Sequence, residues 1–331
     1  MQQRPIRILG TGKYLPKRVL SASDIDQMLG VSPGWVQAKT GVLTRHFADG
    51  EPSSQMGAKA ARAALEAAGL TLDDIDCLVC ASGTAEQGIP CTAALIQQAL
   101  GLEHSGLPSF DIDSTCLSFV VALDTMSYLV AAGRYRRILI VSTDIASVGL
   151  DWQDKESAAI FGDAAAAVVI GLAEPHQSSK ILGARLETYS SGAHLSEIVG
   201  GGSKHHPLTY TEEIRDLFYF KMDGKAVFKL SAQLLPDFVA KVMQESGTRL
   251  DAMKWVIPHQ ASLPAMKLME KRLGVSGRFY MHAQRHGNTI AASIPLGLHE
   301  AITRGEVQRG DHLLLLGTSA GLSLGGLVLE Y

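Results

Sequence analysis

Cysteine, net charge and long apolar runs are all scarce in this sequence. Four cysteines in 331 residues are too few for a disulfide framework, so a reducing compartment, the cytoplasm, is expected. The formal charge of −3 gives no bulk attraction to nucleic acid or to an anionic membrane surface. The opening MQQRPIRILG lacks the apolar segment of a secretory signal, and no charge-free run is long enough to span a bilayer. We therefore expect neither nucleic acid nor membrane as a partner.

Apolar sequence is abundant, and it is arranged as alternating strands and helices. Hydrophobic residues make up 46% of the chain and charged residues 19%, which is typical of a globular protein with a sizeable core. Short branched runs such as 137–141 and 313–316 indicate buried strands, and Ala-rich stretches such as 54–68 indicate helices. The alternation predicts an α/β fold with a largely parallel sheet.

A weak internal repeat divides the sequence. Residues 69–79 resemble residues 247–257, which lie 178 positions later, and Gly133 matches Gly305, 172 positions later. Because any α/β protein repeats helix, glycine, loop and strand, these matches leave chance similarity open. Their collinear order favours two copies of one unit. We expect one half over residues 1–172 and a second over 173–331, joined by a turn-rich connector.

Only Cys116 among the four cysteines has a context suited to chemistry. It follows Ser114 and Thr115, two good N-cap residues, and begins a predicted helix that runs to Ala132. Unpaired backbone N–H groups and the positive dipole end of a helix favour a thiolate and can hold a developing oxyanion. We therefore expect a nucleophilic thiolate at Cys116. The remaining cysteines fit small core residues: Cys77, Cys80 and Cys91.

A histidine and an asparagine in the second half complete a candidate constellation. His259 follows the predicted strand 255–258, at the carboxyl end where open α/β sheets bind ligands. Asn288 follows Gly287 at the start of another apolar helix. Under the repeat, Asn288 is the counterpart of Cys116, because 172 positions separate them. Two related helix ends would then bring the three side chains together.

Two kinds of chemistry use Cys, His and Asn. In a cysteine hydrolase the Asn orients a His base for the Cys, and the chain order here agrees with that arrangement. In thioester chemistry the thiolate accepts an acyl group while His and Asn donate hydrogen bonds to an enolate oxygen. The residues around Cys116 are not the Cys-Gly-Ser-Cys-Trp of papain-like enzymes.

The middle stretch, residues 189–223, breaks the alternation of strands and helices. We expect it to form a loop region on the substrate side. Its neighbouring histidines, His205 and His206, point different ways on most backbones, so no metal site is expected there.

Motifs along almost the whole chain resemble one family, the β-ketoacyl-acyl-carrier-protein synthase III family of the thiolase superfamily. The motifs are Leu9–Pro16, Trp35, Lys39–Val42, Arg45-His46, Cys116, Ile160–Asp163, Pro258–Ala261 and His286–Asn288. The resemblance implies a duplicated thiolase-like fold with five layers, αβαβα, and a homodimer. It also implies an acyltransferase of fatty acid biosynthesis.

The resemblance assigns roles to the candidate residues. Cys116 would take an acyl group from an acyl-CoA, and His259 and Asn288 would stabilise the enolate of a decarboxylating malonyl thioester. The backbone N–H groups of Cys116 and Ala320 would form the oxyanion hole. The malonyl carrier would be acyl carrier protein or CoA, and no metal or cofactor would be needed. The alternatives are a relative that joins two acyl-CoAs or transfers an acyl group without decarboxylation, a Cys-His-Asn hydrolase and an inactive scaffold.

The resemblance also places the CoA-binding residues and the acyl-chain gate. CoA would lie against Trp35, Lys39, Lys155 and Lys225. Ile89 occupies the gate position, where a phenylalanine is frequent, so a smaller gate predicts acyl chains longer than acetyl.

The chain departs from the family pattern at several positions. Lys39 and Lys155 stand where Arg is common, which keeps the charge but loses bidentate geometry. Pro264 replaces an Arg that docks the carrier protein, and Glu86 is either a base or a solvated loop acid. The segments around the nucleophile and in the last turn also differ: Ser114–Phe119 and Thr318–Gly321.

Overall fold

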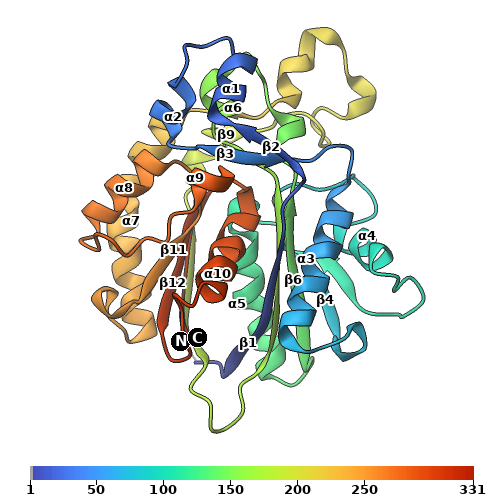
Figure 1. The fold of residues 1–331 in the computed structure, drawn as a ribbon, viewed down its shortest axis with the longest axis vertical. Helices are drawn as coiled ribbons and strands as arrows, with labels where there is room; N and C mark the ends of the chain where they lie inside the picture. Colours follow the sequence, from blue (N-terminus) through green and yellow to red (C-terminus); the bar gives the residue numbers. More distant parts are fainter. Residues whose placement is uncertain (1–2) are drawn as a thin grey trace.

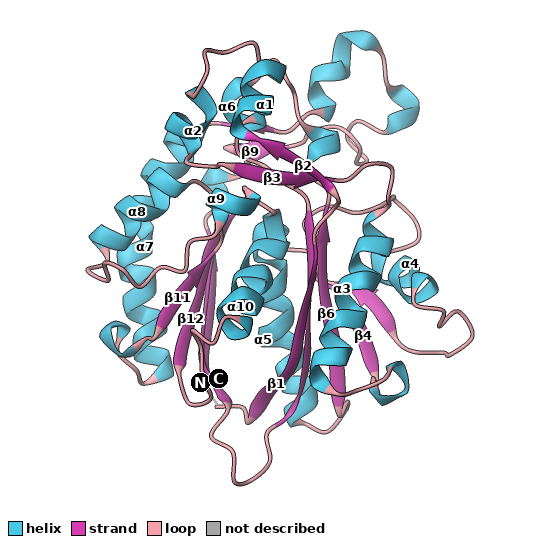
Figure 2. Ribbon diagram, viewed as in Figure 1, coloured by secondary structure: helices cyan, strands magenta, loops and turns pink. Residues whose placement is uncertain are grey.

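Two β-sheets face each other across a central layer of helices, and further helices cover their outer faces. The structure is a computed structural model that describes residues 3–331. The resulting sequence of layers is α-β-α-β-α (Figures 1 and 2). This matches the five layers that the family resemblance implies.

The first sheet takes all its strands from the first half of the chain. Its order is β1-β7-β6-β4-β5. Neighbours β4, β5 and β6 are parallel, whereas β7 runs antiparallel to both β1 and β6. The strands are β1 (Ile6–Tyr14), β4 (Cys77–Cys80), β5 (Ser109–Asp111), β6 (Arg137–Asp144) and β7 (Ala164–Leu172).

The second sheet takes its strands from residues 180–330. Its order is β11-β12-β13-β8, and only β11 and β12 are parallel. Both sheets are therefore mixed, and the prediction of a largely parallel sheet is wrong. The pair β12 and β13 is antiparallel because a short turn joins the two strands, whereas β1 with β7 and β8 with β13 are antiparallel pairs of strands far apart in the sequence. The strands are β8 (Lys180–Thr188), β11 (Trp255–Pro258), β12 (His312–Ser319) and β13 (Ser323–Glu330).

Two apolar helices form the central layer. They are α5 (Ser118–Ala131) and α10 (Ser293–Thr303), and each contacts both sheets. A helix between two sheets keeps little solvent-facing surface, which explains why both sequences are mostly apolar. On α5 the exposed part is a stripe that includes Thr125 and Tyr128. The outer helices are α3 (Ser53–Ala68) and α4 (Thr92–Ala99) on one sheet, and α7 (Gly224–Ser246) and α8 (Leu263–Arg272) on the other.

Small elements cover one end of the two sheets (Figure 1). Two short two-stranded antiparallel sheets lie there, β2 with β3 and β9 with β10. The middle stretch contributes β9 and β10, and Leu208 and Tyr210 from this stretch are exposed. The elements are α1 (Ala22–Met28), α2 (Trp35–Thr40), α6 (Lys155–Ala158), α9 (Ala283–His286), β2 (Arg18–Ser21), β3 (Thr44–Phe47), β9 (Ser196–Glu197) and β10 (Lys221–Met222).

Candidate active site

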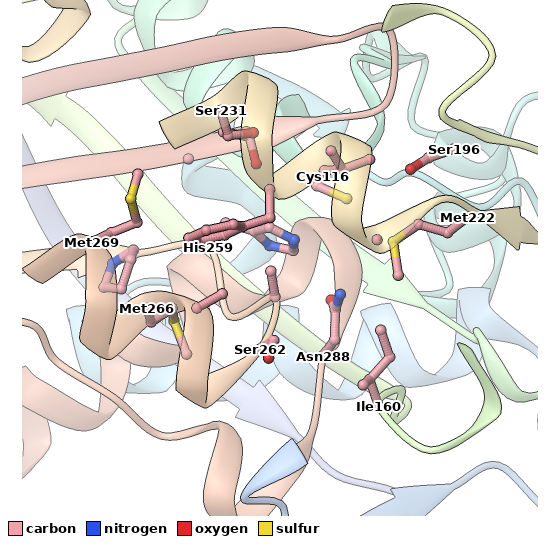
Figure 3. A pocket seen from close by; sticks show the side chains of 18 of the residues that line it. Cys116, Ile160, Ser196, Met222, Ser231, His259, Ser262, Met266, Met269 and Asn288 are labelled. Carbon is pink, nitrogen blue, oxygen red and sulfur yellow. The ribbon is translucent and has the colours of Figure 1, made fainter. Parts of the chain in front are cut away.

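One large cavity of about 520 Å³ contains the three candidate catalytic residues. Cys116, His259 and Asn288 all line it, and Figure 3 shows their side chains around a common space. The volume lies within the range of about 300–1,000 Å³ that is usual for small-molecule sites. Of the other predicted site residues, four also line this cavity: Trp35, Lys39, Lys225 and Ala320.

Cys116 lies in a tight turn that precedes helix α5. This turn is the 3-10 helix η2 (Thr115–Leu117), and Thr115 has a positive φ of 49°. The predicted capping by Ser114 and Thr115 is wrong, because neither side chain caps η2 or α5. The Ser118 hydroxyl instead donates to the Thr115 carbonyl oxygen at 2.7 Å and closes the turn. The positive φ at Thr115 and the 3-10 turn before α5 together direct Cys116 toward the cavity.

Asn288 lies two residues before an equivalent turn. The 3-10 helix η8 (Ile290–Ala292) precedes α10, Ile290 has a φ of 51°, and the Ser293 hydroxyl donates to the Ile290 carbonyl oxygen at 2.8 Å. Thr115 N–H donates to Asp113 Oδ1 at 2.7 Å, and Ile290 N–H donates to Asn288 Oδ1 at 2.9 Å.

These paired features correct the register of the repeat. Thr115 corresponds to Ile290, a separation of 175. The counterpart of Asn288 is therefore Asp113, and the predicted pairing of Asn288 with Cys116 is wrong. Cys116 corresponds instead to Ala291. The match of Gly133 with Gly305 has a separation of 172 rather than 175, because segments outside the two turns differ in length between the halves.

The Asn288 amide has its oxygen fixed and its nitrogen directed elsewhere. Because Oδ1 accepts from Ile290 N–H, the Nδ2 group is left to donate into the cavity (Figure 3). The backbone of Asn288 is held as well: its N–H donates to the Ile160 carbonyl oxygen at 2.7 Å, and its carbonyl oxygen accepts from Gly162 N–H at 3.0 Å.

Gly162 allows the motif Ile160–Asp163 to pair with the backbone segment that carries Asn288. A Cβ on Gly162 would lie 2.1 Å from the His286 carbonyl oxygen, so only glycine lets these two backbones pair. Arg45 is fully buried and donates to the Ala159 carbonyl oxygen at 2.6 Å. Burial lowers the pKa of Arg45 to about 10, which leaves it charged at neutral pH. The motif and Arg45 thus form the support on which Asn288 rests.

His259 follows β11 and is held by Ser293. Its Nδ1 lies 2.8 Å from Ser293 Oγ, so Nε2 is the ring nitrogen that remains for a substrate. Burial lowers the pKa of His259 to about 4, so the ring is neutral at physiological pH. A Cβ on Gly317 would lie 2.9 Å from His259 Cβ and 3.1 Å from Leu117 Cδ2. Gly317 therefore lets the His259 segment and the Cys116 turn approach closely.

The pKa of Cys116 differs from the sequence-based expectation. Burial raises the pKa of the Cys116 thiol to about 12, the carboxylate of Asp144 adds to the rise, and a backbone N–H opposes it. The predicted thiolate is therefore wrong for the ligand-free site. Three residues of 3-10 turn supply fewer aligned dipoles than a full helical turn does, and burial outweighs them.

Asp144 is a site residue that the sequence reasoning missed. Its carboxylate is fully buried and accepts hydrogen bonds from the backbone N–H groups of Gly83, Thr84 and Ala292 at 2.9, 3.0 and 3.1 Å. A Cβ on Gly83 would meet Thr115, so Asp144 connects the loop beneath the Cys116 turn with η8. Burial raises the pKa of Asp144 to about 7. No local signal marks this residue, because its backbone partners lie in two distant segments, Gly83-Thr84 and Ala292.

The mouth of the cavity carries charges of both signs. Lys39 Nζ lies 5.9 Å from the centre of the Trp35 ring and 4.0 Å from Glu156 Oε1. Glu156 and Lys225 also line the mouth. Lys155 is exposed on α6 and is absent from the lining, so its predicted contact with CoA stays a prediction.

Ile89 and Glu86 lie outside the cavity of their own chain. Ile89 is 88% exposed, so its gate role would require a second copy of the chain and stays a prediction. Glu86 accepts hydrogen bonds from Ser54 N–H at 2.6 Å and the Ser53 hydroxyl at 3.2 Å. Glu86 therefore caps the N-terminus of α3 within this chain.

Residues 3–331 lack two further features, a membrane-spanning helix and a metal-binding cluster. Within this range no helix combines the length and apolar character that a bilayer span needs. The same residues contain no group of three or more His, Cys, Asp or Glu side chains arranged to hold a metal ion.

Comparisons with known proteins identify the family. The model of 3-oxoacyl-[acyl-carrier-protein] synthase III matches residues 110–190, and the model of its C-terminal part matches residues 243–331. A β-ketoacyl-[acyl-carrier-protein] synthase III of Neisseria meningitidis is 34% identical over 327 residues, which cover 98% of this chain and 99% of the relative. The chain belongs to the 3-oxoacyl-[acyl-carrier-protein] synthase III family. It is therefore a condensing enzyme of the acyltransferase class.

Solved structures of the family confirm the thiolase-like fold. The synthase III of Aquifex aeolicus superposes with a TM-score of 0.88 at 30% identity, covering all of both chains. The synthase III of Pseudomonas aeruginosa superposes with a TM-score of 0.88 at 31% identity, covering 99% of this chain and 98% of the other. The predicted family and fold class are confirmed.

Proposed function

We propose that this synthase joins an acyl group from acyl-CoA to a malonyl thioester with loss of CO₂. The observation that carries the proposal is that Cys116, His259 and Asn288, which come from three separate segments, line one cavity. Relatives named β-ketoacyl-[acyl-carrier-protein] synthase III support the reaction class, and their name supports acyl carrier protein as the malonyl carrier.

In the first half-reaction, Cys116 is the nucleophile. A bond forms between Sγ and the acyl carbon, the bond from that carbon to the CoA sulfur breaks, and the thiol proton ends on CoA. The backbone N–H groups of Cys116 and Ala320 would hold the tetrahedral oxyanion. Such donors are typically worth about 3–4 kcal/mol each to the transition state. Because the ligand-free thiol is neutral, attack depends on substrate binding and proton removal.

In the second half-reaction, His259 and Asn288 act on the malonyl thioester. As CO₂ leaves, its bonding electrons form an enolate, and the thioester oxygen accepts hydrogen bonds from His259 Nε2–H and Asn288 Nδ2–H. Nε2 carries the proton when the single Ser293 hydroxyl proton turns from the Ile290 carbonyl oxygen to Nδ1, across the 2.8 Å separation. The carbanion then attacks the acyl carbon, the bond to Sγ breaks, and the Cys116 thiolate takes up a proton. Loss of CO₂ makes the condensation effectively irreversible.

The arrangement around His259 argues against the cysteine hydrolase alternative. A hydrolase of that kind needs Asn to orient the His base. Here Nδ1 of His259 is engaged by Ser293, and Asn288 Oδ1 is engaged by Ile290 N–H. The two side chains therefore stand side by side as independent donors, which suits an enolate oxygen.

The position of CoA, the oligomeric state and the location of the enzyme also form part of the proposal. CoA would lie at the mouth beside Trp35, Lys39 and Lys225, while Lys155 would reach its phosphates from the rim. The enzyme would work in the cytoplasm as a homodimer, with Ile89 of one copy beside the site of the other. It would need neither a metal nor a cofactor.

Release of labelled CO₂ tests the reaction. The purified protein is given an acyl-CoA and a malonyl thioester labelled in its free carboxyl group, and labelled CO₂ and 3-oxoacyl product are counted. The proposal expects equal amounts of both, with Cys116→Ala making no 3-oxoacyl product. Product without labelled CO₂ would indicate condensation of two acyl-CoAs, and free acid without a malonyl donor would indicate a hydrolase.

A further inference from the structure

The side chain of Gln260 is fully buried, and each of its two polar atoms has two hydrogen-bond partners. Its Oε1 accepts from the backbone N–H groups of His282 and Ala283 at 2.9 and 3.0 Å. Its Nε2 donates to the carbonyl oxygens of Pro258 and Tyr280 at 2.9 and 3.1 Å. Because the partners of Oε1 are all donors and those of Nε2 all acceptors, only this orientation of the amide satisfies all four.

These hydrogen bonds join the two segments that carry the candidate enolate donors. On one side, β11 ends immediately before His259. On the other side, Oε1 of Gln260 holds the start of α9, and Asn288 follows the last residue of α9 by two positions. A shift of α9 against the end of β11 would therefore change the distance between the His259 and Asn288 side chains.

A closed ring of hydrogen bonds leads from Gln260 back to His259. His282, whose N–H binds Gln260, has its ring Nε2 2.9 Å from the Ser293 carbonyl oxygen. A carbonyl oxygen only accepts, so His282 Nε2 carries the proton. The Oγ atom of Ser293 then lies 2.8 Å from His259 Nδ1. A Cβ on Gly297 would lie 2.9 Å from His282 Nε2, so glycine lets this ring pack against α10.

The chemistry of the second half-reaction requires this kind of rigidity. An enolate oxygen accepts from both donors only where His259 Nε2–H and Asn288 Nδ2–H converge on one point, and Figure 3 shows both side chains around one space. A displacement of about 1 Å can cost about 100-fold in rate. Because a buried polar group that loses its partner is costly, the four bonds of Gln260 resist such a displacement.

We infer that Gln260 is a positioning residue for decarboxylation, whose side chain sets the spacing between His259 and Asn288. The inference rests on the proposed function and adds the residue that holds the two donors relative to each other. Gln260 does not line the cavity, so it acts through these two side chains. Cys116 is held by the turn before α5 in the other half of the chain. Acylation of Cys116 therefore does not depend on Gln260, whereas release of CO₂ does.

Gln260→Met tests this separation, because it keeps the length of the side chain and removes all four hydrogen bonds. The protein is acylated with an acyl-CoA, its acylated Cys116 is counted by mass spectrometry, and CO₂ release from a labelled malonyl thioester is measured per acylated site. We expect CO₂ release per site to fall about tenfold to 100-fold, with the acylation rate within about twofold of the unmodified protein.

The other outcomes of this experiment separate the inference from the proposed function. Unchanged CO₂ release per site in Gln260→Met, or equal falls in acylation and CO₂ release, would overturn the inference alone. An unmodified protein that is acylated on Cys116 and releases no CO₂ would refute the proposed function, and the inference with it.

Two further variants distinguish positioning from a loss of stability. Val242 is fully buried in the core of the second half and is absent from the cavity lining. Val242→Ala therefore destabilises this half without touching the amide, and we expect CO₂ release per acylated site to stay unchanged. Gln260→Glu keeps an acceptor for α9 but loses the donor to the β11 end. It gives a second reading if Gln260→Met fails to fold, with an expected fall of about tenfold per site.

A double substitution tests whether Gln260 acts through Asn288. In Asn288→Ala one of the two donors is already absent, so Gln260→Met has only His259 left to displace. We expect the fold-loss caused by Gln260→Met to be smaller in Asn288→Ala than in the unmodified protein. The same fold-loss in both backgrounds would contradict the inference.

Discussion

The Cys116 turn and the turn after Asn288 share one backbone design and differ in the side chains that they carry. Both 3-10 turns begin with a residue of positive φ, and both are closed by a serine hydroxyl, Ser118 or Ser293. The first has cysteine where the second has Ala291, and the second has asparagine where the first has Asp113. A duplicated turn has thus provided two different chemical groups, a nucleophile in one half and a hydrogen-bond donor in the other.

The difference between Asn288 and Asp113 is a single polar group, and exchanging it has the largest expected effect. Asn288→Asp keeps the acceptor for Ile290 N–H but replaces the donating amide nitrogen by an oxygen. We expect condensation to slow by about 10²–10³-fold, the usual loss for one oxyanion donor. The rate of CO₂ release measures this. Asp113→Asn is the matched control, and an equal loss in both variants would refute the division of labour.

The pKa of Cys116 tests whether its turn stabilises a thiolate. Because burial raises the thiol pKa to about 12, we expect the rate of iodoacetamide labelling of Cys116 to rise about tenfold per pH unit between about pH 7 and 9. Peptide mapping separates Cys116 from Cys91, which is exposed, so the prediction that Cys91 is a core residue is wrong. A rate that is already constant at neutral pH would mean that the turn holds a thiolate.

The two closing serines are expected to affect different half-reactions. Ser293 also holds His259 Nδ1, so Ser293→Ala is expected to slow CO₂ release about five- to tenfold, the worth of one net hydrogen bond. Ser118→Ala loosens the Cys116 turn and is expected to slow acylation instead. Stopped-flow acylation and CO₂ release are measured on both variants. We expect Ser118→Ala to slow mainly acylation and Ser293→Ala to slow mainly CO₂ release. A parallel loss in both steps would show that the serines only stabilise the fold.

Asp144 joins the two turns, and its removal has the smallest expected effect. Because its folded-state pKa of about 7 is above the ordinary carboxyl value, the folded protein binds more protons than the unfolded chain between about pH 4 and 7. This contribution to stability is complete at low pH and is lost as the pH rises through about 7.

Asp144→Asn removes that titration. We expect its unfolding free energy to depend less on pH between about 4 and 7 than that of the unmodified protein, and its kcat to fall a few-fold because Ala292 N–H loses a charged acceptor. Denaturant unfolding at several pH values measures the first effect. Identical pH profiles for the two proteins would contradict the assignment of this pKa to Asp144.

Much of the site could be predicted from local sequence. Cys116 precedes an apolar helix, His259 ends a buried strand and Asn288 follows a glycine turn, and these contexts place all three at the ends of buried elements. The structure brings them to one cavity. Their catalytic roles remain predictions that come from this placement and from the family.

The rest depends on contacts between distant segments. The register of the repeat comes from hydrogen bonds inside the turns, which sequence matching across insertions does not reveal. The high pKa of Cys116 follows from burial, whereas the sequence suggests only a helix end. Ser293, Arg45 and Asp144 act through partners 34, 114 and 148 positions away, so no local pattern marks them.

The most direct test of the central claim is intact-mass spectrometry through one catalytic cycle. The protein is first exposed to an acyl-CoA, freed of excess reagent, and then given a malonyl thioester. We predict a gain of one acyl mass that peptide mapping assigns to Cys116, followed by return to the original mass with one CO₂ released per acyl group lost. An acyl group on another residue, or an adduct on Cys116 that persists while CO₂ is released, would contradict the account.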